Sequence, residues 1–270
     1  MAEGKKSKSR IFELDLFRGI AVLLMMFDHF MYDLAYLLPA LFSDYPRPGF
    51  TARLCGTARR YWAWDVRLAV RFFVVFVFLA LTGVCCSFSG SNLKRGARLF
   101  AVSLGLSAAT RLFGRLAGDP EITVVFGVLH CISVTLILVA LLEKLSPGKW
   151  FYLAAGILCF AVGLVLERNA APILIGEEGA FRSAFFVALG LRYGGGDSFP
   201  LFYGGGQILV GVFLGKQFYA DRKSLLFRSY PGGPVALIGR HSLLFYLGHQ
   251  VLLPLAAGAA LLCCGFSLAL

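Results

Sequence analysis

Long apolar runs separated by short polar connections form the main pattern along the chain. A hydrocarbon core about 30 Å thick is crossed by about 20 helical residues, and six runs reach or approach that length. These runs are Leu16–Leu38, Val70–Phe88, Leu99–Leu116, Thr123–Leu142, Trp150–Leu166 and Val235–Leu262. A seventh, Phe199–Phe218, is apolar but rich in glycine, whereas Phe181–Leu191 is too short to cross and is expected to form an interfacial or re-entrant helix. The pattern predicts an all-α, polytopic membrane helix bundle with about seven transmembrane helices.

The composition agrees with this prediction, because 58% of the 270 residues are hydrophobic and only 15% are charged, outside the range of soluble globular domains. No long linker interrupts the apolar pattern. We therefore expect a basic N-terminal tail over residues 1–10 and a single transmembrane domain over 11–270. The run behind the tail is too long for a signal peptide and has no A-x-A cleavage site, so it is expected to be a retained first span.

The net charge of +11 arises mostly from Lys and Arg between the apolar runs, where they orient helices and contact anionic lipid. Thirteen lie in segments that are internal if the N-terminus is internal. Five arginines in the first outer connection oppose this bias: Arg47, Arg53, Arg59, Arg60 and Arg67. We predict a cytoplasmic N-terminus, the lipid bilayer as a partner and no nucleic-acid partner. Three of these residues, Arg53, Arg59 and Arg60, are expected to contact the lipid surface or to hold an anionic acceptor.

Neither cysteine nor histidine spacing indicates a metal site. The seven cysteines include two adjacent pairs inside apolar runs, and no C-x-x-C spacing occurs. His241 and His249 are eight residues apart, about 12 Å along a helix, too far to share one ion. We predict no metal.

The first apolar run, together with Asp15 just before it, carries five ionisable residues, which are costly in a bilayer and therefore point to function. At about 100° per residue, Asp15, Arg18, His29 and Asp33 share one stripe of the helix, whereas Asp28 points away. Arg18 is expected to pair with Asp15. Asp33 is expected to hydrogen-bond one ring nitrogen of His29 and leave the other as an acceptor, as a general base requires. The alternative is a polar stripe that only docks this helix against its neighbours.

Other polar features lie in later apolar runs. His130 and His249 are intramembrane histidines, and Arg240 and His241 begin the last predicted span. The segment "LRYGGGDSFPLFYGGGQ" has two triple glycines, whose backbone can approach a ligand closely. Ordinary close helix packing explains the same glycines equally well.

Several motifs together resemble one family. "LDLFRGIAVLLMMFDHFMYDL", "RFFVVFVFLALTGVCCSFS", "FGVLHCISV", "DSFPLFYGGGQILVGVFLG" and "IGRHSLLFYLGHQ" occur in the order found in bacterial relatives of heparan-α-glucosaminide N-acetyltransferase. Arg18 and His29, with ten residues between them, are also similar to the arginine and histidine of the distant membrane acyltransferase-3 families.

The resemblance implies an acyl-CoA-dependent membrane acyltransferase. It moves an acetyl or other acyl group from acetyl-CoA or another acyl-CoA to the amine or hydroxyl of a cell-envelope sugar or glycolipid. By position, His29 is the catalytic base or acyl carrier and Arg18 its partner, with Asp33 orienting His29. Donor binding then falls to Arg18, Arg240, His241, His130 and His249.

The resemblance also implies a multi-pass protein of the bacterial plasma membrane, and a homodimer is left open. The alternative is a small-molecule or proton-coupled transporter that uses the same Asp, Arg and His as a relay. A third hypothesis is a relative that has lost catalysis and acts as an interaction partner.

Overall fold

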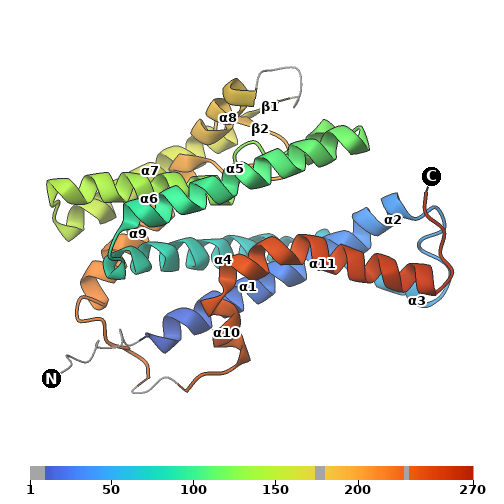
Figure 1. Ribbon diagram of the computed structural model, residues 1–270, viewed down its shortest axis with the longest axis horizontal. Helices are drawn as coiled ribbons and strands as arrows, with labels where there is room; N and C mark the ends of the chain where they lie inside the picture. Colours follow the sequence, from blue (N-terminus) through green and yellow to red (C-terminus); the bar gives the residue numbers. More distant parts are fainter. Residues whose placement is uncertain (1–9, 174–179, 228–230, 270) are drawn as a thin grey trace, which may run out of the picture. The chain divides into compact units, whose positions relative to one another are not determined.

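The computed structural model describes residues 10–173, 180–227 and 231–269 (Figure 1). It divides into two compact units, which are described separately below. The first comprises Met1–Phe78 with Leu226–Leu270, and the second comprises Leu79–Leu225. The prediction of one transmembrane domain over 11–270 stays a prediction.

Helices dominate both units, and six of those described are long and apolar enough to cross a membrane. They are Phe12–Leu41, Asp65–Phe88, Asn92–Leu116, Val128–Leu145, Lys149–Arg168 and Ser242–Cys263. The glycine-rich seventh run forms helix α9, Leu201–Phe218, which is not among the six. The predicted all-α membrane bundle is therefore confirmed, with six spans where about seven were expected.

The first unit contains α1 (Phe12–Tyr32), the π-helix η1 (Asp33–Leu37), α2 (Leu38–Leu41), α3 (Phe50–Trp62), the start of α4 (Asp65–Val84), α10 (Pro234–Arg240) and α11 (Ser242–Cys263). Its apolar core includes Leu34, Ala35 and Leu38, which pack with Cys55 and Ala58 of α3 and with Leu261 of α11.

The π-helix arises beside Pro39, which has no N–H group to donate. The N–H of Leu38 bonds the carbonyl of Asp33 instead of that of Leu34. Two side chains donate to the neighbouring carbonyls. Tyr45 Oη lies 3.5 Å from Leu34 O, and Arg59 Nε lies 3.4 Å from Ala35 O. The end of the first span is therefore completed by residues that follow it.

Helices α1 and α10 cross with their backbones in contact. A Cβ added to Gly19 would collide with the carbonyl oxygen of Val235, and one added to Gly239 would collide with that of Asp15. The prediction that the last span begins at Val235 is therefore wrong. The chain forms the short helix α10, leaves helical geometry at His241, and begins the membrane-length helix at Ser242.

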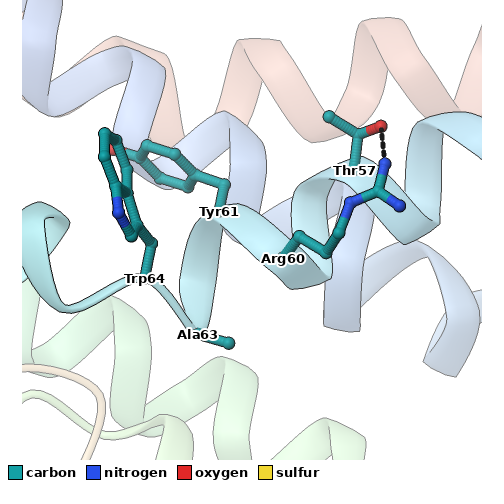
Figure 2. A pocket seen from close by; sticks show the side chains of 5 residues that line it. All are labelled: Thr57, Arg60, Tyr61, Ala63 and Trp64. Carbon is teal, nitrogen blue, oxygen red and sulfur yellow. Dashed lines mark hydrogen bonds between the residues drawn. The ribbon is translucent and has the colours of Figure 1, made fainter.

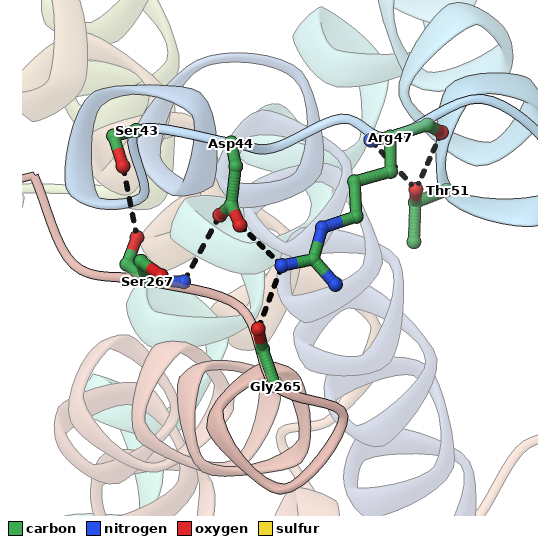
Figure 3. Close-up of polar contacts among 6 residues, drawn as sticks. All are labelled: Ser43, Asp44, Arg47, Thr51, Gly265 and Ser267. Carbon is green, nitrogen blue, oxygen red and sulfur yellow. Dashed lines mark hydrogen bonds and ion pairs between the residues drawn. The ribbon is translucent and has the colours of Figure 1, made fainter.

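The C-terminal segment is attached to the connection between α2 and α3 (Figure 3). The Ser267 N–H donates to Asp44 Oδ1 at 3.0 Å, and Arg47 donates to both Asp44 and the carbonyl of Gly265. The pKa of Asp44 is lowered by the hydrogen bond from Arg47 and by that from the Ser267 backbone.

The second unit begins with the end of α4 and the 3₁₀ turn η2 (Cys85–Phe88). It continues through α5 (Asn92–Ala117), η3 (Pro120–Ile122), α6 (Val128–Leu142), η4 (Glu143–Leu145), α7 (Lys149–Arg168), α8 (Ala180–Leu189) and α9. The strands β1 (Ala171–Pro172) and β2 (Arg192–Tyr193) pair in parallel.

The second triple glycine lies inside α9 and allows close packing. A Cβ on Gly206 would lie 2.6 Å from Phe160 N, and one on Gly204 would lie 2.6 Å from Cys131 Sγ. Helix packing therefore accounts for these glycines. In the first triple glycine, the Gly195 N–H donates to Glu121 Oε2 at 3.2 Å. Asp197, which follows this loop, accepts the N–H of Val128 at 2.9 Å and so caps α6.

Candidate functional site

The polar stripe predicted on the first helix lies within α1 and the first turn of η1 of the first unit. Arg18 Nη1 lies 3.7 Å from Asp15 Oδ1, so the predicted local pair is confirmed. Arg10 also reaches Asp15, at 3.5 Å. Gly239 of α10 packs on the carbonyl of Asp15, and Arg240 is the next residue. Arg240 therefore lies directly after the point where α10 meets this end of α1. Arg18 and Arg240 therefore belong to the same end of the first unit.

His29 is half-buried on α1, and its ring makes a backbone contact. Its Nδ1 lies 2.9 Å from the carbonyl oxygen of Met25. Since a carbonyl only accepts, Nδ1 must carry the hydrogen, which leaves the lone pair of the neutral ring on Nε2. The prediction that Asp33 accepts the hydrogen bond of this nitrogen is wrong, because the carbonyl of Met25 in the same helix accepts it. The outcome for Nε2 is nevertheless the one that a general base requires.

His249 of α11 lies beside His29. The two ring centroids are 5.0 Å apart and the rings are inclined at 71°, an edge-to-face arrangement. The sequence predicted both residues as parts of the site but did not predict their contact. Asp33 is buried one turn beyond His29, at the start of the π-helix.

Asp28 points away from the stripe, as predicted, and forms an ion pair that the sequence analysis missed. Its carboxylate accepts from Arg67 Nε at 2.7 Å, from Arg67 Nη2 at 2.9 Å and from Tyr61 Oη at 2.9 Å. The guanidinium also lies 3.3 Å from the centroid of the Trp62 ring. Burial, followed by the bond to Asp28, raises the pKa of Tyr61 to about 12. We call the contacts among Asp28, Tyr61, Trp62 and Arg67 the lock. They fix α1 against α3 and the first turn of α4.

A hollow of about 460 Å³ opens beside this lock and is lined by Thr57, Arg60, Tyr61, Ala63 and Trp64. Figure 2 shows Tyr61 and Trp64 close together on one side of it and Arg60, bonded to Thr57, on the other. Of the outer arginines considered as anion-binding residues, Arg60 lines the hollow, whereas Arg59 donates to the π-helix. A cation beside an indole ring suits a polar or anionic headgroup.

His130 lies in the second unit, and both of its ring nitrogens contact protein. Gly127 N lies 3.4 Å from Nδ1, and Ser107 Oγ lies 3.3 Å from Nε2. Ser107 in turn donates to Val124 O at 2.6 Å. These bonds give the buried ring a structural role at the start of α6. Its predicted donor-binding role stays a prediction.

Two buried polar residues were missed by the sequence analysis. Glu13 is fully buried in the first turn of α1, and Gln207 is 1% exposed in α9. Neither amide atom of Gln207 has a hydrogen-bond partner within the described part of the chain. In the sequence, each of these two residues could have been noticed only as a polar residue inside an apolar run. His241 is exposed between α10 and α11. Among the described residues, no three His, Cys, Asp or Glu gather to hold a metal ion.

The fold and the paired histidines define the class as a multi-pass α-helical membrane protein with candidate proton-transfer groups inside a span. Residues 10–45 and 49–251 match the family model described as heparan-alpha-glucosaminide N-acetyltransferase, catalytic. The chain therefore belongs to this family, as the motifs predicted, and the family implies acetyltransferase activity in a membrane protein. No curated protein matches the chain, and no solved structure matches it.

Proposed function

We propose that this protein transfers an acetyl group from acetyl-CoA, or another acyl group from an acyl-CoA, to the amine or hydroxyl of a cell-envelope sugar or glycolipid. His29 acts on the reacting atoms. The observation that carries the proposal is the contact between His29 Nδ1 and Met25 O, because it places the lone pair of the neutral ring on Nε2. The family match supplies the reaction class.

Two routes use this lone pair. In direct transfer, the acceptor nitrogen or oxygen attacks the thioester carbonyl carbon, Nε2 takes its proton, the C–S bond breaks, and the thiolate receives the proton. In the covalent route, Nε2 attacks the thioester first and carries the acyl group until the acceptor displaces it. Direct transfer requires a ternary complex, whereas the covalent route gives ping-pong kinetics.

The donor is proposed to bind at the end of the first unit where α1 and α10 cross. Arg18, held by Asp15, offers a guanidinium to an anionic group, and Arg240 and His241 follow the crossing glycine. Guanidinium groups bind phosphate in a bidentate manner, so this end suits the phosphates of CoA. Arg18 and His29 are about 16 Å apart along the helix at 1.5 Å per residue. An extended pantetheine chain can span this distance.

The acceptor is proposed to dock in the hollow lined by Arg60 and Trp64, at the other end of α1 from Arg18. Asp33, buried one turn beyond His29, is proposed to favour the protonated ring that forms during transfer. Under this proposal the protein lies in the bacterial plasma membrane with its N-terminus in the cytoplasm. The donor then binds from the cytoplasmic side.

The first experiment measures binding of acetyl-CoA to purified protein, with Arg18→Ala beside the wild type and Arg111→Ala as a matched control. Arg111 is an exposed arginine of α5 in the second unit. Free-thiol release is then followed with a panel of amino sugars. We expect saturable binding that Arg18→Ala weakens, and acceptor-dependent thiol release that His29→Ala abolishes.

Two outcomes would overturn the proposal. Wild-type protein that is monodisperse but does not bind acetyl-CoA would favour the transporter hypothesis, and flux into liposomes would then be measured. Thiol release that His29→Ala leaves unchanged would remove His29 from the reaction. For the acceptor site, Arg60→Ala is expected to raise the acceptor KM while leaving acetyl-CoA binding unchanged.

A further inference from the structure

His249 carries a buried ring nitrogen that has no hydrogen-bond partner in the described part of the chain. The residue is 3% exposed, and its Nδ1 lies 2.7 Å from Tyr246 O and 3.1 Å from Phe245 O. Both carbonyls accept, so Nδ1 carries the hydrogen and the lone pair of the neutral ring sits on Nε2. Nε2 is buried and has no hydrogen-bond partner among the described residues. Such an atom costs about 1–3 kcal/mol of stability, a cost typical of positions kept for function.

The nearest ionisable ring is that of His29, and the two rings complement each other. Their centroids are 5.0 Å apart, in edge contact. His29 is half-buried, whereas His249 is buried, so a substrate can reach the first ring while only a proton needs to reach the second. When His29 Nε2 gains a proton it becomes a donor, and His249 Nε2 is an acceptor that no described residue occupies. The edge contact between the two rings is the place where the proton is proposed to pass.

We propose that His249 is a proton-relay residue that lets His29 use acceptors arriving as ammonium ions. This inference rests on the proposed acyltransferase function. An ammonium must lose two protons to become an amide, and a single histidine holds one at a time. The first proton passes from the ammonium to His29 Nε2 and on to His249 Nε2, which restores the lone pair of His29.

The remaining steps account for every proton and for the bond that breaks. In direct transfer, the neutral amine attacks the thioester carbon, His29 takes the second proton, and the C–S bond breaks. That proton goes to the thiolate, and the proton on His249 leaves to solvent. The products are the amide, free CoA thiol and one proton. In the covalent route, Nε2 of His29 already carries the acyl group when the acceptor arrives, so it cannot take a proton from the ammonium. The relay therefore belongs to direct transfer, in which Nε2 of His29 is free to pass the first proton to His249.

The test compares two acceptors at about pH 6, where an alkyl ammonium is protonated and an aryl amine is neutral. Glucosamine is the alkyl ammonium acceptor, and 4-aminophenyl β-D-glucoside is the aryl amine acceptor. The variant His249→Gln keeps an N–H for the carbonyl contacts but removes the base. We expect kcat/KM to fall about 100-fold with glucosamine, the low end of the range for a positioned proton acceptor, and less than about threefold with the aryl amine. Leu252→Ala, an exposed position on the same helix, is the control.

A variant that merely loosens the fold lowers both rates equally, so equal losses, or no loss with either acceptor, overturn the relay. A second variant, His249→Ala, leaves space for imidazole, which is expected to restore the glucosamine rate. Asp33→Asn is measured in parallel, because Asp33 is also buried near this part of α1. An ammonium-specific loss at Asp33 without one at His249 assigns the relay to Asp33 and overturns the proposal. Wild-type protein inactive with both acceptors refutes the acyltransferase function itself.

Discussion

Replacing Asp28 with leucine removes the carboxylate that holds Arg67, and we expect this to be among the most damaging single changes in the first unit. Arg67 is 3% exposed, so its charge has little access to water. Both its Nε and its Nη2 donate to Asp28, at 2.7 and 2.9 Å. In the variant the cation stays buried without its anion, and Tyr61 Oη loses its acceptor.

The magnitude follows from this geometry. Removing one partner of a buried ion pair costs about 3–5 kcal/mol. The contact between the guanidinium and the Trp62 ring remains in the variant and partly stabilises the cation, so the lower end of the range applies. At about 2 °C per kcal/mol for a protein of this size, a loss of about 3 kcal/mol lowers Tm by roughly 6 °C.

The assay is thermal unfolding in detergent, followed by tryptophan fluorescence at one heating rate. The double variant Asp28→Leu with Arg67→Met removes both charges, and we expect it to recover at least half of the loss because no unpaired ion remains. Arg71→Met, an exposed arginine one turn further along α4, is the matched control and is expected to change Tm little. A double variant that unfolds as early as Asp28→Leu would refute the reasoning.

Three further predictions address other contacts. Gly239→Ala forces a Cβ into the carbonyl of Asp15 and should destabilise by about 1–3 kcal/mol or more in the same melts, whereas Gly258→Ala, with 3.8 Å to Phe42, should be tolerated. His130→Ala leaves the buried N–H of Gly127 without its acceptor and should cost about 1–3 kcal/mol, whereas Ser107 keeps its bond to Val124; lost acetyl-CoA affinity in folded protein would instead support donor binding. Because its folded pKa is lowered, Asp44 stabilises the C-terminal contact above its unfolded pKa. Below about pH 4 the protection of the Ser267 amide against deuterium exchange, taken relative to the intrinsic rate at each pH, should fall, and Asp44→Asn should remove this change in protection.

Local features of the site were predictable from the sequence, because they depend on helical spacing. The Arg18–Asp15 pair follows from residues three apart on one helix, and the membrane spans follow from run length. The position of Asp28 on the face away from the stripe followed in the same way. Its partner did not, since Arg67 is 39 residues away in another helix.

The remaining features depend on how helices meet. The contact of His29 with His249 joins the first and last long helices, and no periodicity within either helix indicates it. The role of His130 depends on Ser107 of α5, which the motif around the histidine does not contain. The break at His241 results from the close crossing of α10 on α1, where Gly239 was the available signal.

The unusual end of the first span has a consequence for the way the protein is assembled. The carbonyls of Leu34 and Ala35, close to Pro39, accept hydrogen bonds from Tyr45 and Arg59, which emerge later from the ribosome. In a bilayer, each carbonyl without a donor costs several kcal/mol. The first helix is therefore incomplete when it first enters the membrane, and it becomes fully stable only after α3 has been synthesised and has docked. Insertion of the first span should therefore be followed by a separate step in which α3 docks and completes its end.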